Sequence, residues 1–534
     1  MKSKSNIIKY IFILFAIFII GFAIYKINYK EKNPVVGNEV KENVVDNTSA
    51  DVITNLRLGI AKFDNINPVI TKNRDIINLS TIIYEPLLTL TEDYKTQNAL
   101  AEEWSKINDV TYIVKLKDNL KWEDGSQLTA RDIQFTIEKL KEGKSIYSAN
   151  VTNIKEVEIV DELTARINLS KKGPFFEYNL IFPIISNKQF SGEKDFFSSR
   201  IAPMSNGMYK VKSATAESME LVKNDNWYNT GSVNRKIDNI KINFYGTMGD
   251  AYSSFKIGNI DMICTSNVNI SDYIGTIGFT TKDYKGRELD FLSFNCKDEI
   301  LSRKEVRQAI QYAIDKNKII SSVYGNEYYI SSFPLDYGHY LYAKNSENNY
   351  NQSKAKKVLE DAGWVYKYGR WQKTEEYRTK AISINLVVDS SNKNRVKVGK
   401  LIEKQLEDIG IRVSLNQVSN ASYKNYLKNK NYDMIITGIY NGYSPDLSYF
   451  LGKDNIANYE NEEALQLLNE VENIIDENLL KEKYNRIEEI YVEDVPYICL
   501  YRDKRKVVYN MRMTGNFTPN NYTAYYNFTN WYRQ

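Results

Sequence analysis

The residue types that usually carry enzyme chemistry are sparse in this chain. His339 is the only histidine among 534 residues, so a Ser-His-Asp or Cys-His arrangement would have to include it. No serine stands in a Gly-x-Ser-x-Gly turn. Cys264, Cys296 and Cys499 lack metal-binding spacing, and we interpret them as buried thiols, with a Cys264–Cys296 pair as the open alternative. We expect no metal and no cofactor, and we interpret His339 as a loop residue.

One short motif resembles a catalytic signature. The tetrapeptide that begins at Ser353 matches Ser-x-x-Lys, in which a lysine assists a nucleophilic serine. The accompanying Lys-Thr-Gly is absent, because Lys373 and Thr374 are followed by Glu375. A helix N-cap at Ser353 explains the same letters. Since no phosphate-binding Gly-x-x-x-x-Gly-Lys-Ser/Thr loop is present either, the sequence predicts that the protein is not an enzyme.

Residues 111–141 predict a strand, a turn and a helix in succession. The first part alternates apolar and polar side chains, with the apolar ones at Tyr112, Val114 and Leu116. A turn is expected at Asp124-Gly125, and Thr129 with Asp132 forms a capping box. The helix that follows repeats apolar residues at Ile133, Ile137 and Leu140.

The same region carries a longer pattern, Leu-Lys-Trp-x-Asp-Gly-x-x-Leu-Thr-Ala-x-Asp at positions 120–132. It closely resembles a pattern of the family 5 extracellular solute-binding proteins, the peptide-type receptors of ABC importers. Further matches follow in family order: Tyr84-Glu85-Pro86-Leu87, Asn206-Gly207-Met208-Tyr209, Val306-Arg307-Gln308-Ala309-Ile310 and Val495-Pro496-Tyr497. The resemblance runs from about residue 56 to the C-terminus.

The resemblance implies an α/β chain with a two-lobed periplasmic-binding-protein type II fold and an additional subdomain in the first lobe. The alternation of predicted strands and helices agrees with an α/β class. We assign residues 55–288 to the first lobe with the subdomain at about 81–204, residues 289–500 to the second lobe, and residues 501–534 to the return of the chain to the first lobe.

Several local predictions concern the second lobe. Ser302 and Glu305 predict a capping box for a helix with one apolar face, formed by Val306, Ala309, Ile310, Ala313 and Ile314. Gly363 predicts the end of the helix that begins at Ser353. Strands are expected at residues 289–295, 384–388, 411–415 and 434–436. We interpret four large aromatic side chains as packing residues: Trp122, Trp364, Tyr449 and Phe450.

The N-terminal sequence predicts targeting to the membrane. Residues 10–25 are uncharged and mainly apolar and are flanked by lysines; as a helix they would span about 24 Å, against a hydrocarbon core of ~30 Å. A cleaved signal peptide and a retained anchor both fit, and we favour an anchor at residues 1–27. Residues 28–54 are polar and predict a flexible tether. The remainder would then lie on the outer face of the cell membrane, extracellular or periplasmic.

The resemblance also implies how a ligand binds. An extended peptide would pair its backbone with residues 71–74 and 438–440, in a cleft that closes between the lobes. Relatives that bind oligopeptides fix the ligand's amino group with an aspartate, but here that position falls on Gly442 or Tyr443, and the nearest acid is Asp446. The ligand-binding residues so implied are Thr71, Lys72, Asn73, Arg74, Gly438, Ile439, Tyr440, Asn441, Gly442, Tyr443 and Asp446.

Peptide is therefore the leading ligand, with ABC permease subunits as partners and the membrane contacted through the N-terminal helix. The alternatives are a receptor of the same fold for an oligosaccharide or amine metabolite, and an envelope sensor or scaffold that no longer transports. A net charge of +4 from 71 basic and 67 acidic residues does not indicate a nucleic-acid partner. We expect a monomer.

Overall fold

The computed structural model describes residues 54–533 except 267–269, 276–277, 336–337 and 345–349, and these described residues belong to one compact unit, Val52–Gln534. The predicted anchor at 1–27 and almost all of the predicted tether at 28–54 lie outside the described residues. In the part of the chain that the structure does describe, none of the helices combines the length and apolar character needed to span a bilayer.

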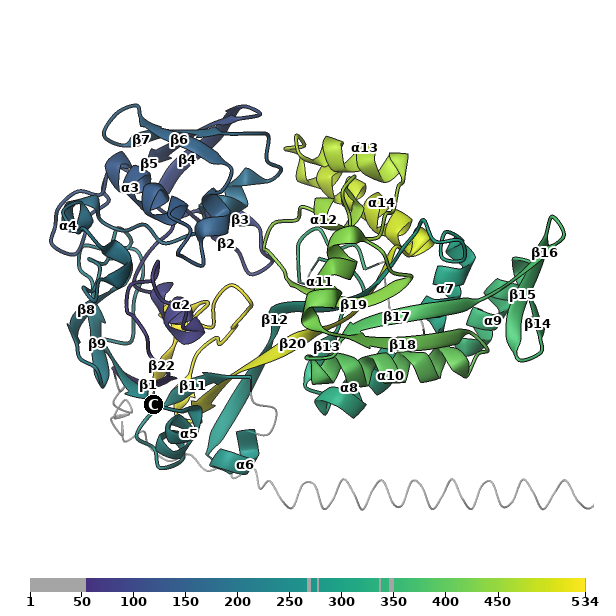
Figure 1. Ribbon diagram of the computed structural model, residues 1–534. Coiled ribbons are helices and arrows are strands. Elements are labelled where there is room, and N and C mark those ends of the chain that lie inside the picture. The colour runs from purple at the N-terminus through teal and green to yellow at the C-terminus, as the bar shows by residue number, and fades with distance from the viewer. Residues whose placement is uncertain (1–53, 267–269, 276–277, 336–337, 345–349, 534) are drawn as a thin grey trace, which may run out of the picture. The chain divides into compact units, whose positions relative to one another are not determined.

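A single mixed sheet of eleven strands organises the unit (Figure 1). Its order is β18 (Arg412–Val418), β17 (Ser383–Asp389), β19 (Met434–Tyr440), β12 (Phe279–Phe294), β20 (Tyr497–Asn510), β11 (Met262–Thr265), β1 (Asn55–Ala61), β10 (Asn239–Tyr245), β9 (Ser218–Lys223) and β8 (Tyr209–Ala214). The remaining strand, β13 (Tyr328–Ile330), pairs with β20. The four strands that we predicted in the second lobe are all present, as β12, β17, β18 and β19.

The two long strands β12 and β20 are neighbours in the middle of this sheet and connect its two halves. The first part of β12 pairs with the last part of β20, from Phe279↔Asn510 to Lys285↔Lys504. After a register shift the pairing resumes at Leu289↔Arg502, where the other edge of β12 also pairs with β19. A shift of this kind is a β-bulge, which bends the strand and redirects side chains. The lobe boundary that we assigned at 288/289 falls at this bulge and stays a prediction.

The helices pack through apolar faces on the two sheets or on neighbouring helices. Their bounds are α2 (Arg74–Ser80), α3 (Ala130–Lys141), α4 (Asn187–Phe190), α5 (Met248–Lys256), α6 (Ile270–Ile274), α7 (Lys304–Ala313), α8 (Lys316–Tyr324), α9 (Gln352–Asp361), α10 (Lys393–Glu407), α11 (Asn420–Asn429), α12 (Ser448–Leu451), α13 (Glu462–Val471) and α14 (Glu477–Asp494). In α7 the predicted apolar face is fully buried: Val306, Ala309, Ile310 and Ala313.

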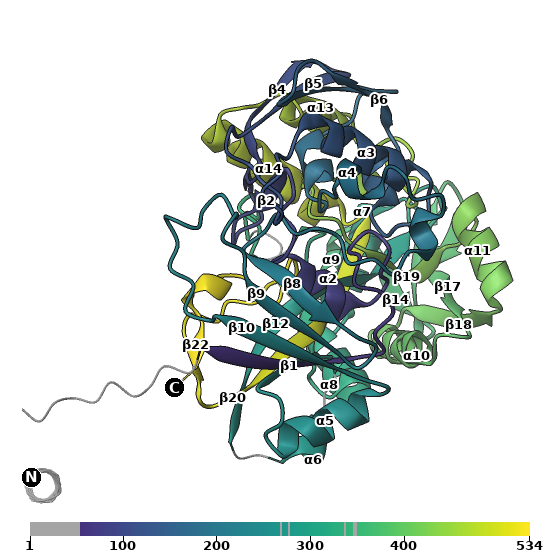
Figure 2. The ribbon, with the colours of Figure 1, turned by 90° about the vertical axis from the view of Figure 1, so that its left-hand side faces the viewer.

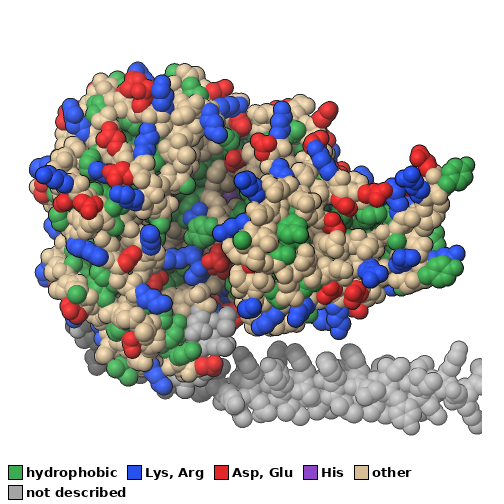
Figure 3. All heavy atoms as spheres, in the orientation of Figure 1, with side chains coloured by type: hydrophobic (Ala, Val, Ile, Leu, Met, Phe, Trp, Pro, Cys, Tyr) green, Lys and Arg blue, Asp and Glu red, His purple; other side chains and the backbone are tan. Residues whose placement is uncertain are grey.

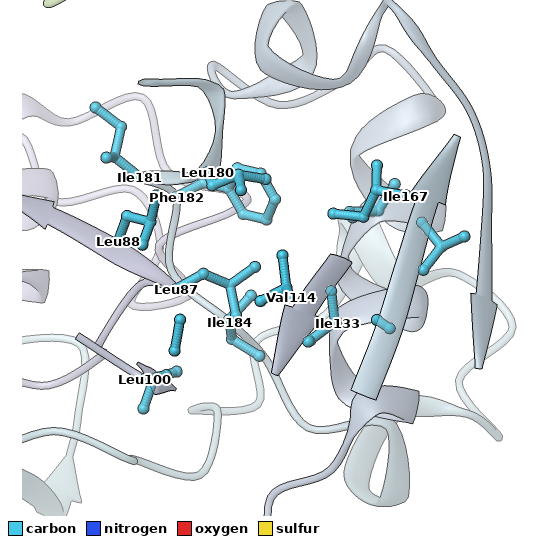
Figure 4. Close-up of a cluster of buried hydrophobic side chains, with 14 of the residues drawn as sticks. Leu87, Leu88, Leu100, Val114, Ile133, Ile167, Leu180, Ile181, Phe182 and Ile184 are labelled. Carbon is cyan, nitrogen blue, oxygen red and sulfur yellow. The ribbon is translucent and has the colours of Figure 1, made fainter. Parts of the chain in front are cut away.

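A second, antiparallel sheet lies within the predicted subdomain. Its order is β4 (Ala101–Asn108), β5 (Thr111–Leu116), β7 (Thr164–Leu169) and β6 (Ile154–Ile159). Its core joins side chains of β5, β7 and α3 to the segment around η2 (Phe176–Leu180); Val114, Ile133, Ile167 and Leu180 are among them (Figure 4). The predicted capping box of α3 is confirmed, since the amide of Thr129 donates to Asp132 Oδ2 at 2.8 Å. Trp122 is buried in this core, as predicted.

Short strands and turns complete the unit. They are β2 (Leu88–Leu90) with β3 (Thr96–Asn98), β14 (Val365–Lys367) with β15 (Arg370–Glu375) and β16 (Arg378–Ala381), β21 (Met513–Thr514) with β22 (Tyr532–Arg533), and η1 (Ser148–Val151), η3 (Phe196–Ser198) and η4 (Phe528–Asn530). The chain end packs against the first strands, where Phe528 and Trp531 share a core with Leu56 and Leu58. Figure 2 shows β1, β10, β9 and β8 side by side in this region.

Two predicted helix starts are wrong. Asn351, not Ser353, caps α9, and its side chain accepts from the amide of Lys354 at 2.9 Å. Ser302 does not cap α7, because the preceding turn is closed by Asp298, whose carboxylate accepts from two amides, so that the helix starts one residue later. Gly363 does end α9, with a φ of +82°.

The structure also tests three packing predictions and the cysteine prediction. Trp364 and Phe450 are buried, but Tyr449 is 45% exposed, so its assignment to the core is wrong. Its ring only flanks Phe450 from outside. The three cysteines are free thiols, so the Cys264–Cys296 pair does not form; Cys499 is buried, whereas Cys264 and Cys296 are only partly so.

Candidate functional site

A cavity of about 430 Å³ opens beside the bulge of β12, and the surface is hollowed in this part of the molecule (Figure 3). Side chains from sequence-distant segments line it: Arg74, Ile77, Asn78, Ser80, Thr81, Tyr84, Pro86, Ile146, Tyr147, Ala149, Asn150, Tyr178, Asn179, Ile181, Pro183, Arg287, Tyr440, Gly442, Tyr443, Ser444, Asn521 and Tyr522. Its volume falls in the range of about 300–1,000 Å³ that is typical of small-molecule sites.

The start of α2 positions Arg74. Asn73 caps the helix by accepting from two amides, at 2.9 Å from that of Asp75 and 3.2 Å from that of Ile76. The preceding turn is held by Asp64, which accepts from the Thr71 hydroxyl at 2.5 Å and from the Lys72 amide at 2.7 Å. Arg74 is therefore the first helical residue of a well-anchored turn, with its side chain at the cavity.

The bulge of β12 positions Arg287. At the neighbouring Gly286, an added Cβ would lie 1.9 Å from Asp503 Oδ1, so only glycine fits there. The same carboxylate oxygen accepts from the amide of Glu288 at 2.9 Å. Asp503 thus holds the irregular turn of the strand, and the turn directs Arg287 toward the cavity.

Arg287 organises the residues that follow β19. Its Nε donates to the carbonyl of Asn441 at 2.7 Å, and its guanidinium lies 4.0 Å from the ring centroid of Tyr443 and 4.5 Å from that of Tyr440. Arg74 approaches the Tyr440 ring from 5.7 Å. Cation–π contacts at these distances are attractive. Two arginines and two tyrosines therefore form one connected wall of the cavity.

The cavity is positively charged. Its lining includes Arg74 and Arg287 but no aspartate or glutamate. Within the described residues, neither guanidinium forms an ion pair. Burial raises the pKa values of Tyr147 and Tyr522, so that both remain neutral hydroxyl donors at physiological pH. The lining thus offers many hydrogen-bond donors and a net positive charge.

One edge of β19 is left open beside the cavity. β12 pairs with β19 as far as Tyr440, but β17 pairs with it only at Leu386↔Met434 and Val387↔Ile435. Among the described residues, the outer edge at 438–440 has no strand partner. At Gly438, a Cβ would lie 2.2 Å from Asp290 Oδ1 and 2.3 Å from Arg395, because the ion pair of these two residues covers that position.

The implied ligand-binding residues divide into two groups. Arg74, Tyr440, Gly442 and Tyr443 line the cavity. The others lie outside its lining. Thr71, Lys72 and Asn73 build the turn before α2; Gly438 and Ile439 lie within β19; Asn441 binds the Pro334 carbonyl; and Asp446 accepts from the amide of Ser448 at 2.8 Å. For all eleven residues, contact with a ligand stays a prediction.

Sequence reasoning missed Arg287, Tyr147 and Tyr522. Arg287 had a detectable signal, because Gly286 interrupts a strand pattern and a glycine there indicates a bulge or a close approach. Tyr147 and Tyr522 carried no such signal, since they lie in irregular segments that only the tertiary fold brings together.

A smaller cavity of about 290 Å³ adjoins this site and shares Arg74 and Asn78 with it. Asp75 and Arg505 line it together with Cys264 and Tyr284. Burial raises the pKa of Asp75 to about 6, although Arg505 and Arg74 act in the opposite direction. Unlike the main cavity, this one holds a carboxyl group.

An α/β unit whose main sheet carries a polar, tyrosine-rich cavity has the architecture of a solute receptor. The chain belongs to the family described as bacterial extracellular solute-binding proteins, family 5 middle, whose model matches residues 95–459. The predicted family, the α/β periplasmic-binding-protein fold and the assignment as a binding protein rather than an enzyme are thereby confirmed.

Individual relatives agree with this assignment. The chain is 25% identical over 449 residues to the oligopeptide-binding protein AppA of Bacillus subtilis, covering 79% of this chain and 81% of AppA. It is 24% identical over 473 residues to heme-binding protein A of Haemophilus influenzae, covering 80% and 83%. Among solved structures, the open form of the periplasmic murein tripeptide binding protein MppA matches with a TM-score of 0.76 at 17% identity, covering 90% of this chain and 97% of MppA.

Proposed function

We propose that this family 5 receptor captures a peptide in the cavity beside β19 and delivers it to the permease of an ABC importer. The observation that carries the proposal is the open edge of β19 at 438–440, next to a cavity lined by Tyr440 and Tyr443. A strand edge can pair with any extended backbone, so it supplies affinity that does not depend on the ligand's side chains. The similarity to AppA, an oligopeptide-binding protein, supports the same ligand class.

A compact non-peptide solute is the second candidate. Two observations favour it: the cavity measures only about 430 Å³, and its lining has no carboxylate to hold a peptide's amino group. The similarity to a heme-binding protein shows that relatives include receptors for other solutes. The two candidates share the cavity and differ in whether the edge of β19 is used.

Delivery completes the proposed function. Residues 1–27 would anchor the receptor and residues 28–54 would tether it, so that the unit 55–534 works at the outer face of the membrane as a monomer. The two proposed lobes would close around the solute, and the closed form would dock on the permease. The first lobe comprises residues 55–288, with the subdomain at about 81–204, and the return of the chain at 501–534. The second lobe comprises residues 289–500.

The test uses the full chain in detergent and a pool of tripeptides and tetrapeptides, with bound species identified by native mass spectrometry. We expect peptides to bind, and Tyr440→Ala to weaken their binding about fivefold, because an aromatic wall contact is worth roughly 1 kcal/mol. Tyr377→Ala is the matched control, because that ring is fully exposed and does not line the cavity. Equal affinities of the two variants, or no bound peptide, would refute peptide capture at this site.

A further inference from the structure

We infer that the solute carries an oxyanion group, a carboxylate or a phosphate, which binds between Arg74 and Arg287. The inference rests on the proposed receptor function and adds the charge of the ligand to it. It predicts that the receptor selects its solutes by a negative group rather than by the amino group that an aspartate would hold.

The first observation is that Arg74 is not paired with a carboxylate among the described residues. Its guanidinium lines the cavity, and within the described part of the chain it makes neither an ion pair nor a side-chain hydrogen bond. A guanidinium offers five N–H donors and is always protonated, and elsewhere in this chain arginines meet carboxylates in paired geometry, as Arg395 meets Asp290. The donors of Arg74 are left for a ligand.

The second observation is that Arg287 is fixed in place yet only partly satisfied. Its Nε is used by the carbonyl of Asn441, and its flat face lies against Tyr443. These contacts orient the group without neutralising it, since no described carboxylate pairs with it. A preoriented, uncompensated arginine at a cavity wall is suited to bind an anion, because little side-chain entropy is lost on binding.

The third observation is the character of the remaining lining. Tyr147 has no hydrogen-bond partner for its hydroxyl among the described residues, and Tyr522 accepts from Thr89 at 3.1 Å, which leaves its own proton free to donate. The lining has no acidic side chain to pair with a cationic group, and Arg74 and Arg287 would repel such a group. The cavity therefore favours an anion on charge and on hydrogen bonding together.

The carboxyl group of Asp75, in the adjoining cavity, strengthens the contrast. Asp75 lines only the smaller cavity, where Arg505 also lies. The smaller cavity therefore combines Asp75 with Arg74 and Arg505, whereas the main cavity has Arg74 and Arg287 and no acidic side chain in its lining. An anion in the main cavity meets two arginines and no carboxylate of the lining.

The experiment compares matched probes on the full chain by equilibrium dialysis. Two pooled tetrapeptide libraries of equal composition are used, one as free acids and one as C-terminal amides, together with citrate and inorganic phosphate as non-peptide anions. We expect the acid library to bind at least tenfold more tightly than the amide library. We also expect Arg74→Gln and Arg287→Gln each to remove most of that difference.

Two further variants separate charge from folding. Arg287→Lys keeps the charge and should retain part of the preference for acids. Lys282→Gln, on the same strand but outside the cavity lining, removes one positive charge and should leave the preference intact. Melting temperatures of all variants report whether a loss of binding reflects unfolding.

Each outcome is decisive. Equal binding of the acid and amide libraries would overturn the inference and leave peptide capture standing. Binding of citrate or phosphate with neither library would uphold the anion preference and overturn peptide capture. An acid preference that survives both Arg→Gln variants would overturn the assignment to Arg74 and Arg287, and no binding of any probe would overturn both proposals.

Discussion

At Asp75, burial and charge act in opposite directions, and burial wins. The carboxyl group lies at the smaller cavity, and its pKa is raised to about 6 even though Arg505 and Arg74 are near. In the unfolded chain an aspartate titrates near 3.9. The folded protein therefore holds this proton over a pH range in which the unfolded chain has already lost it.

This difference predicts how stability depends on pH. Because the folded pKa is the higher one, the contribution of Asp75 is fully present below about pH 4 and is lost as the pH rises to about 6. Asp75→Asn mimics the protonated form and should stabilise the protein at pH 7.5 by about 1–3 kcal/mol, with little effect at pH 4. Urea unfolding at both pH values measures this, with the exposed Asp272→Asn as control. A gain that is the same at the two pH values would contradict the account.

The bulge in β12 is the element on which the site depends. It exists because Gly286 leaves room for Asp503, and it places Arg287 at the cavity. A regular strand would have continued the alternation of side chains and kept a simple register with β20. The missing side chain at Gly286 therefore allows the bulge that places Arg287 at the cavity.

Gly286→Ala should consequently cost about 2–3 kcal/mol of unfolding free energy, since its Cβ would lie 1.9 Å from Asp503 Oδ1 and must displace it. Gly231→Ala is the matched control, because nothing lies within 4 Å of the Cβ that it would add. Urea denaturation compares the two. If both variants unfold at the same urea concentration as the parent, the close approach of Asp503 to Gly286 does not stabilise the bulge.

The elements show how far sequence patterns reach. Alternation predicted β5 and helical spacing predicted α3 and α7, because these elements bury one face and the periodicity records it. Helix starts were less predictable: Asn351 and Ser353 are both good caps, and only the path of the chain selects between them. The irregular segments around Tyr147 and Tyr522 have no periodicity, so their meeting at the cavity could not be predicted.

For the molecule as a whole, the resemblance predicted the family and the class of fold correctly. Comparison of individual residues with the family pattern also showed that one expected binding residue is absent. The aspartate that would hold a peptide's amino group is absent from its expected place at Gly442 or Tyr443. The structure shows two arginines at the cavity that contains those residues. The positive charge of the proposed binding site therefore follows from sequence and structure together.

The central claim is that a solute binds in the cavity between α2 and the end of β19. Hydrogen–deuterium exchange of the full chain, measured with and without the free-acid tetrapeptide pool, tests where binding occurs. We predict slower amide exchange at residues 438–444 and 74–81, because a strand partner and an occupied cavity protect these amides. Protection confined to other segments, or none at a peptide concentration that saturates binding, would contradict the account.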